Sequence, residues 1–158
     1  MPAPFSDFDR AMAHLLHRLG LPPLASPAQA CRLDVGDGMP VYCADRAGTW
    51  LEMQACAGFL RHDPNGALRA ALLALQARQP AGPLCSLAVN GDTNSVVIRI
   101  RLPLADVRPE GMIEALQALR AHAAAAAAIL AGGAATPVRR PLSPLARSVI
   151  TRGARVRS

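Results

Sequence analysis

The sequence predicts an α+β fold, an antiparallel sheet flanked by helices in the order α-β-β-β-α-β-β-α. Apolar residues recur at helical spacing in three segments. The segments between them alternate apolar and polar residues, as half-buried strands do. Short turns join most of the strands directly to one another. This arrangement favours an antiparallel sheet over a doubly wound parallel one, in which helices separate successive strands.

The first predicted helix covers about residues 7–19. Ser6 and Asp9 have the spacing of a capping box, and a glycine followed by two prolines ends the segment. His14 and His17 lie three residues apart on the polar side, where we expect solvated surface in place of a metal site, because no third ligand is near. The apolar stripe on the other side is the best in the sequence: Phe8, Met12, Leu15, Leu16 and Leu19.

Three strands should follow, over residues 31–35, 41–43 and 49–54. Cys31, Leu33 and Val35 alternate with polar residues, and glycine-containing turns separate the three strands. Because the connections are so short, the strands must pair as an antiparallel meander.

A second helix is predicted over residues 67–77, followed by strands over 84–89 and 95–102. Leu73 lies well off the apolar stripe of this helix, so the helix should pack against two partners. A last helix should cover residues 109–131, with Asp106 as its cap and an alanine-rich second half that strongly favours helix. Its core stripe is Met112, Leu116, Leu119, Ala123 and Leu130.

The formal net charge of +6 belongs to the C-terminal segment. The chain has no lysine, and residues 1–133 carry as many acids as arginines. Residues 134–158 hold no acid and three prolines. We therefore predict a neutral domain over 1–133 and a flexible basic tail over 134–158, which can attract phosphate, lipid headgroups or acidic protein surfaces. The tail cations are Arg139, Arg140, Arg147, Arg152, Arg155 and Arg157.

Several classes of chemistry lack their sequence signatures. The four cysteines include no CxxC pair, and Cys31 and Cys43 have the pattern of small buried hydrophobes. No glycine-rich phosphate loop precedes a helix, and no paired-carboxylate motif occurs. We therefore expect no catalytic residue, no metal ion and no cofactor. An enzyme would require His62, His122 and a cysteine to meet in one pocket.

The composition also indicates where in the cell the protein is located and which classes of molecule it can bind. Apolar residues make up 51% of the 158 residues, enough for one core and too many for a disordered chain. We recognise no signal peptide and no membrane-spanning run, so we expect a cytoplasmic protein without membrane insertion. Aromatic residues are only 3%, which disfavours stacking on nucleic-acid bases. The alternative left open is a nucleic-acid-binding or regulatory protein that acts through the tail, with steep salt dependence.

Five consecutive segments carry a family resemblance: the helix FSDFDRAMAHLLHRLGLPPL, the meander RLDVGDGMPVYC…TWLEMQA, the helix ALRAALLALQ, the hairpin SLAVNGDTNSVVIRIRLPL and the helix EGMIEALQALRAHA. Together they resemble the Tir-chaperone (CesT-type) class I chaperones of bacterial type III secretion, over about residues 5–131. Within that family the chain looks most like the HpaB-like Hrp export-control chaperones. The resemblance implies a cytoplasmic homodimer that binds the N-terminal region of secreted effector proteins, keeps them soluble and export-competent, and delivers them to the secretion ATPase without an enzymatic step.

The resemblance also implies where partners bind. The first helix and the meander would supply the client-binding residues, Phe8, Met12, Leu15, Leu16, Leu19, Leu33, Val35 and Met53. The second helix and the next strand look like the dimer element, with Leu72, Leu73 and Leu87. Two features depart from the family. Its members are commonly acidic whereas this domain is neutral, and the basic tail has no counterpart in the minimal fold, so its role is not carried over.

Overall fold

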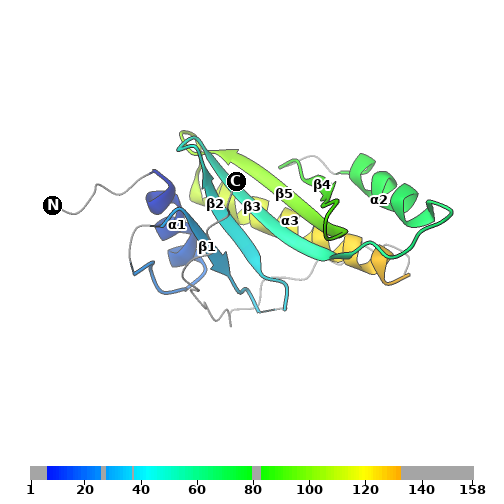
Figure 1. Ribbon diagram of the computed structural model, residues 1–158. Coiled ribbons are helices and arrows are strands. Elements are labelled where there is room, and N and C mark those ends of the chain that lie inside the picture. The colour runs from blue at the N-terminus through cyan, green and yellow to red at the C-terminus, as the bar shows by residue number, and fades with distance from the viewer. Residues whose placement is uncertain (1–6, 26–27, 37, 80–82, 133–158) are drawn as a thin grey trace.

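The computed structural model describes residues 7–25, 28–36, 38–79 and 83–132, which form one sheet with helices against it (Figure 1). The predicted α+β class and order of elements are confirmed. Ser6 and the basic tail lie outside the described residues. The elements are α1 (Asp7–Arg18), β1 (Ala30–Leu33), β2 (Val41–Arg46), β3 (Trp50–Phe59), α2 (Ala67–Ala77), β4 (Ser86–Val89), β5 (Ser95–Pro103) and α3 (Pro109–Leu130).

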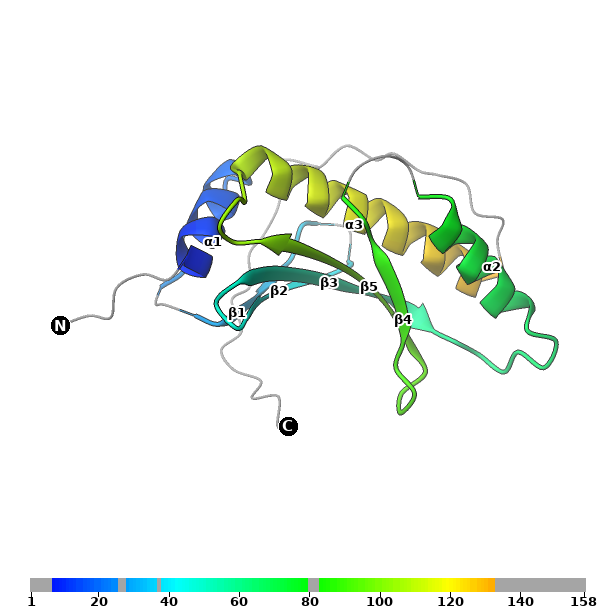
Figure 2. The same cartoon turned by 90° about the horizontal axis from the view of Figure 1, so that it is seen from above.

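The sheet is antiparallel throughout, and its strand order is β1-β2-β3-β5-β4. β3 and β5 form the central pair, so β1 and β4 are the edges. Figure 2 shows α1 and α3 on one side of the sheet. In the described part of the chain no helix covers the other side, which we call the open face. Its main side chains alternate with the core residues along the strands: Arg32, Tyr42, Ala44, Arg46, Trp50, Glu52, Gln54, Arg99 and Arg101.

A tight turn between β2 and β3 fixes the register of the meander. Ala47 and Gly48 both have positive φ, 58° and 68°, as the two central residues of a type I′ turn do. The carboxylate of Asp45 accepts a hydrogen bond from the Gly48 N–H at 2.8 Å. The turn therefore places Arg46 opposite Trp50 and Cys43 opposite Met53.

β3 is longer than the predicted strand, because it continues to Phe59. The small residues after Gln54 hide the alternation, and a bulge between Cys56 and Gly58 shifts the pairing with β5. Gly58 has φ 142°, and a Cβ there would lie 3.2 Å from Leu130 Cδ1 of α3. Glycine at this point therefore allows α3 to approach the strand closely.

α3 packs along the sheet, and its predicted core stripe is confirmed as buried. Asp106, however, is not its cap. The N-cap is Arg108, in extended conformation and without a side-chain hydrogen bond to the helix. Asp106 belongs to a turn in which its N–H donates to the Pro103 carbonyl at 3.3 Å. Pro109 at the start of the helix has no N–H that needs a cap.

By length and hydropathy alone, α3 could also cross a membrane. Its 22 residues have an 18-residue window of mean hydropathy 1.2, and 44% of that window is buried inside the molecule. The alanine-rich second half raises the hydropathy without adding bulk. A helix that packs on the core of a domain meets the same criteria, and α3 contacts β3, β5, α1 and α2.

Candidate functional site

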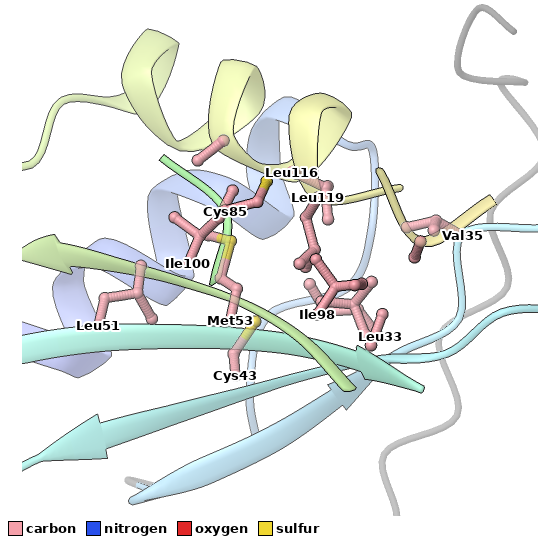
Figure 3. Close-up of a cluster of buried hydrophobic side chains, with 14 of the residues drawn as sticks. Leu33, Val35, Cys43, Leu51, Met53, Cys85, Ile98, Ile100, Leu116 and Leu119 are labelled. Carbon is pink, nitrogen blue, oxygen red and sulfur yellow. The ribbon is translucent and has the colours of Figure 1, made fainter. Parts of the chain in front are cut away.

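The predicted client-binding residues lie almost entirely in the core. Figure 3 shows Leu33, Val35 and Met53 among side chains of β5 and α3. A partner could contact these side chains only if the core opened, so their client contacts remain a prediction. Leu19 is half-buried. The other predicted residues are all buried: Phe8, Met12, Leu15, Leu16, Leu33, Val35 and Met53.

Three half-buried apolar residues surround this part of the core at the surface. Leu19 and Leu24 lie between α1 and β1, and Met39 lies between β1 and β2; all three pack against the core, and we call them the α1–β1 rim. Asp9, itself buried, holds the intervening loop to α1, because its carboxylate accepts a hydrogen bond from the Ala28 N–H at 3.1 Å. The rim is the apolar surface that this end of the molecule offers to a partner.

An exposed apolar surface lies at the other end, where α2 faces the edge strand β4. Leu73 of α2 is 68% exposed, and Leu84, two residues before β4, is 76% exposed. We call these two residues the α2–β4 patch. Of the predicted dimer residues, Leu73 therefore lies in the patch and Leu87 is half-buried, while Leu72 fills the core.

Glutamine side chains hold the patch together. Gln76 Nε2 donates to the Cys85 carbonyl at 2.7 Å, and the Cys85 N–H donates to Gln79 Oε1 at 2.7 Å. Both glutamines belong to the C-terminal end of α2, and Cys85 directly precedes β4. These bonds hold α2, which carries Leu73, against the segment that carries Leu84.

A charged cluster that no sequence pattern indicates lies on the open face. Glu52 is only 1% exposed, although its side chain points away from the helices. Arg46 donates to Glu52 Oε1 through Nε at 3.0 Å and Nη2 at 2.8 Å, and Arg101 Nε donates to Oε2 at 2.7 Å. Arg99 Nε lies 3.7 Å from the same Oε2. Three guanidinium groups thus surround one carboxylate.

The arginines decide the ionisation of Glu52. Burial alone would raise its pKa, but the hydrogen bonds from Arg101 and Arg46, with the charges of Arg46 and Arg99, outweigh burial and hold the pKa below its usual value. Glu52 is therefore an anion at neutral pH. The sequence could not reveal this cluster, because it depends on the register that places Glu52 beside Arg101 on β5.

The open face also carries the only tryptophan and the only tyrosine of the chain. Trp50 is 43% exposed and Tyr42 is 42% exposed. The Arg32 guanidinium lies over the Tyr42 ring, 5.9 Å from its centre, and is 3.5 Å from the Asp34 carboxylate. Large aromatic side chains therefore stand beside the arginine cluster.

Three of the four cysteines and one histidine of the described residues are buried. Cys31 and Cys43 lie opposite each other on β1 and β2 and are buried, as predicted. The Cys43 thiol donates a hydrogen bond to Cys31, which raises the pKa of Cys43 and lowers the pKa of Cys31, and burial raises the pKa of Cys43 further. Burial raises the pKa of Cys85 to about 11, so Cys43 and Cys85 stay protonated at neutral pH. Burial lowers the pKa of His122, which is therefore neutral at pH 7. His14 and His17 are exposed, and the described residues contain no cluster that could hold a metal ion.

The Tir chaperone protein (CesT) family matches residues 10–126, which include every helix and strand in whole or in large part. The chain belongs to this family. The CesT family match begins inside α1 and ends inside α3, so the α1–β1 rim, the open face and the α2–β4 patch all lie within it. Comparison with curated proteins finds no match.

Solved structures share the fold of this CesT-family chain at low sequence identity. One is from the Yersinia pestis type III secretion chaperone SycH in complex with a stable fragment of YscM2, with a TM-score of 0.60, 15% identity, and coverage of 73% of this chain and 96% of that one. Another is from the Pseudomonas aeruginosa ExoU–SpcU heterodimer of the type III secretion system. It matches with a TM-score of 0.64 and 13% identity, and the match covers 75% of this chain and 96% of that one. A chain of the P. aeruginosa ExoT–SpcS complex matches with a TM-score of 0.59 and 18% identity, and the match covers 74% of this chain and 94% of that one.

Proposed function

We propose that the chain is a type III secretion chaperone that acts by binding, without a covalent step. It binds the N-terminal region of a secreted effector, keeps it soluble and delivers it to the secretion ATPase from the cytoplasm. The family match over residues 10–126 carries this proposal, and the shared fold with chains from chaperone complexes supports it. Within the family we assign it to the HpaB-like Hrp export-control chaperones, on the resemblance of its elements.

The client surface centres on the end of the molecule formed by α1 and the meander. In this proposal the α1–β1 rim makes the first contacts, because Leu19 and Leu24 already reach the surface. The buried stripe of α1 supports the rim from within and contacts the client only if the core opens. Apolar surface of this kind can cover an aggregation-prone segment of an unfolded client.

Capture of a secreted effector from a type III-secreting bacterium tests the client surface. We expect the wild-type chain to retain the effector and to lose it when the effector's N-terminal segment is deleted. Leu19→Ser combined with Leu24→Ser should weaken capture about tenfold, because apolar contacts are lost at the rim. Leu68→Ser, a half-buried leucine on α2, is the matched control and should leave capture unchanged.

Two results would contradict the proposal. Recovery of nucleic acid alone would favour the alternative that acts through the basic tail. Equal capture by the Leu19/Leu24 double variant and by the wild type, with both proteins folded by circular dichroism, would exclude the rim as the contact surface.

We also propose that the chain forms a homodimer through the α2–β4 patch. The outward side of α2 is largely apolar, with Arg69 as its one exposed charge, and β4 is an edge strand of the described sheet, where another strand can pair. A second copy would cover both features at once. The exposed residues of α2 are Ala67, Arg69, Ala70, Leu73, Ala74 and Ala77.

Leu73→Asp should convert the dimer to a monomer. The side chain is exposed in the subunit, so folding should persist, whereas a carboxylate buried between two subunits should raise the dissociation constant by about 100-fold or more. Light scattering or sedimentation measures the mass. Ala13→Asp, at an exposed position of α1, is the control and should remain a dimer. A wild-type chain that is monomeric at micromolar concentration would refute the dimer.

A further inference from the structure

The open face has the composition of the centre of a protein interface. Trp50 and Tyr42, the only residues of their types in the chain, are both exposed there instead of filling the core. Arginine, tryptophan and tyrosine are the residues that dominate binding energy at interfaces. Neither the α1–β1 rim nor the α2–β4 patch includes these side chains, so the two surfaces proposed above leave the open face without a role.

Glu52 holds the arginines of this face ready for a ligand. One buried carboxylate orients the guanidinium groups of Arg46, Arg99 and Arg101 but neutralises only one of their charges. Each guanidinium has five N–H donors, of which Glu52 occupies a minority. Arg46 and Arg101 are half exposed, so their remaining donors face the solvent. Fixed guanidinium groups pair with carboxylates at a low entropic cost.

The register of the sheet sets the spacing of these groups. Arg32, Tyr42, Gln54 and Arg99 lie opposite one another on β1, β2, β3 and β5. With neighbouring strands about 4.8 Å apart, the two arginines of this row are separated by roughly 14 Å at the backbone. An extended segment of about four residues has that length. Glu52 and Arg101 lie opposite each other in the neighbouring row.

We propose that the open face binds an extended acidic segment of a partner protein. The carboxylates of the segment pair with Arg32 and Arg99 at the two ends of the row and with Arg46 and Arg101 beside it. Its apolar side chains pack on Trp50 and Tyr42. The surplus of positive charge around Glu52 selects acidic segments over basic ones. The proposal goes beyond the chaperone function, because the open face and the α1–β1 rim can bind or fail to bind independently.

A pair of labelled peptides tests this surface in the full chain. The first alternates glutamate with leucine, and the second has lysine in place of each glutamate. We expect the glutamate peptide to bind in fluorescence anisotropy and to shift the emission of Trp50, which reports on this face alone because it is the only tryptophan. The lysine peptide should not bind. Any binding of the peptide to the basic tail adds the same anisotropy signal in every variant.

Substitutions then locate the binding. Arg32→Gln combined with Arg99→Gln should raise the dissociation constant of the glutamate peptide at least about tenfold. Arg78→Gln, which removes an exposed arginine at the end of α2, is the matched control and should have no such effect. If the double variant does not fold, Tyr42→Ser tests the same face without touching the Glu52 cluster and should weaken binding several-fold.

Three results would overturn the proposal. Peptide binding without a change in Trp50 emission would place the peptide away from the open face. An equal loss in Arg78→Gln would mean attraction to net charge instead of a defined face. Tighter binding of single-stranded DNA than of the glutamate peptide, with the same dependence on Arg32 and Arg99, would make the partner a nucleic acid.

Discussion

Leu15→Asp is expected to unfold the protein. Leu15 is fully buried in the stripe by which α1 joins the core. Removal of a buried leucine side chain costs about 2–5 kcal/mol, and an unpaired carboxylate in its place adds a further cost. Since small domains have a total stability of about 5–15 kcal/mol, the variant should lose most or all of its folded population. Far-ultraviolet circular dichroism and urea unfolding followed by Trp50 fluorescence measure this loss.

The control for this prediction lies on the same helix. Ala13→Asp introduces the same charge at an exposed position and should keep nearly wild-type stability. A comparison of Leu15→Asp with Ala13→Asp also shows how α1 takes part in client binding. If Leu15→Asp remained as stable as Ala13→Asp and yet failed to capture an effector, the apolar stripe would be accessible, and the client contacts predicted for it would be supported directly.

Glu52→Gln is expected to give the second largest loss of stability. The substitution keeps the size of the side chain but leaves Arg46, Arg99 and Arg101 close together without a counter-charge. Breaking a fully buried ion pair costs about 3–5 kcal/mol, and we expect about 2–3 kcal/mol here because the arginines are partly exposed. Urea unfolding at pH 7 measures the difference. Glu114→Gln, an exposed acid on α3, is the matched control and should change stability little.

The effect of Glu52→Gln should disappear in acid. The pKa of Glu52 is lower in the folded protein than in the unfolded chain, so its carboxylate stabilises the fold above the unfolded pKa, near 4.3. As the pH falls through the lower, folded pKa, the wild type loses this contribution, whereas the glutamine variant has none to lose. The two free energies of unfolding should therefore begin to converge as the pH falls below the unfolded pKa and should meet once the pH lies below the folded pKa. A constant difference from pH 7 to pH 3 would show that the charge of Glu52 does not cause the effect.

The sequence predicted the helices and strands well where one clear pattern, helical spacing or apolar–polar alternation, runs through the segment. The second helix has the predicted bounds, and Leu73, which did not fit its stripe, is exposed. The strand that ends at Phe59 was predicted too short, because small residues and a bulge conceal its alternation. The prediction that Asp106 caps the last helix was wrong, because Asp106 lies in a turn before that helix.

Sites were harder to predict than elements, for two physical reasons. An amphipathic stripe shows which side of a helix is apolar, but not whether that side faces the core or a partner, and the residues around Leu15 face the core. Glu52 was missed because its environment arises from pairing between strands, and Arg101 is far from it along the chain. Only the register brings these residues together.

The central pair of strands has a consequence for how the chain folds. β5 pairs with β3 only after the segment that carries α2 and β4 has been synthesised, because the chain passes through both elements before it returns to the middle of the sheet. Closing so long a loop slows folding relative to the local hairpins. On the ribosome, the β1–β3 meander therefore emerges with an unpaired edge on β3, of the kind that pairs with other chains. The nascent chain is thus exposed to aggregation until residues 95–103 arrive.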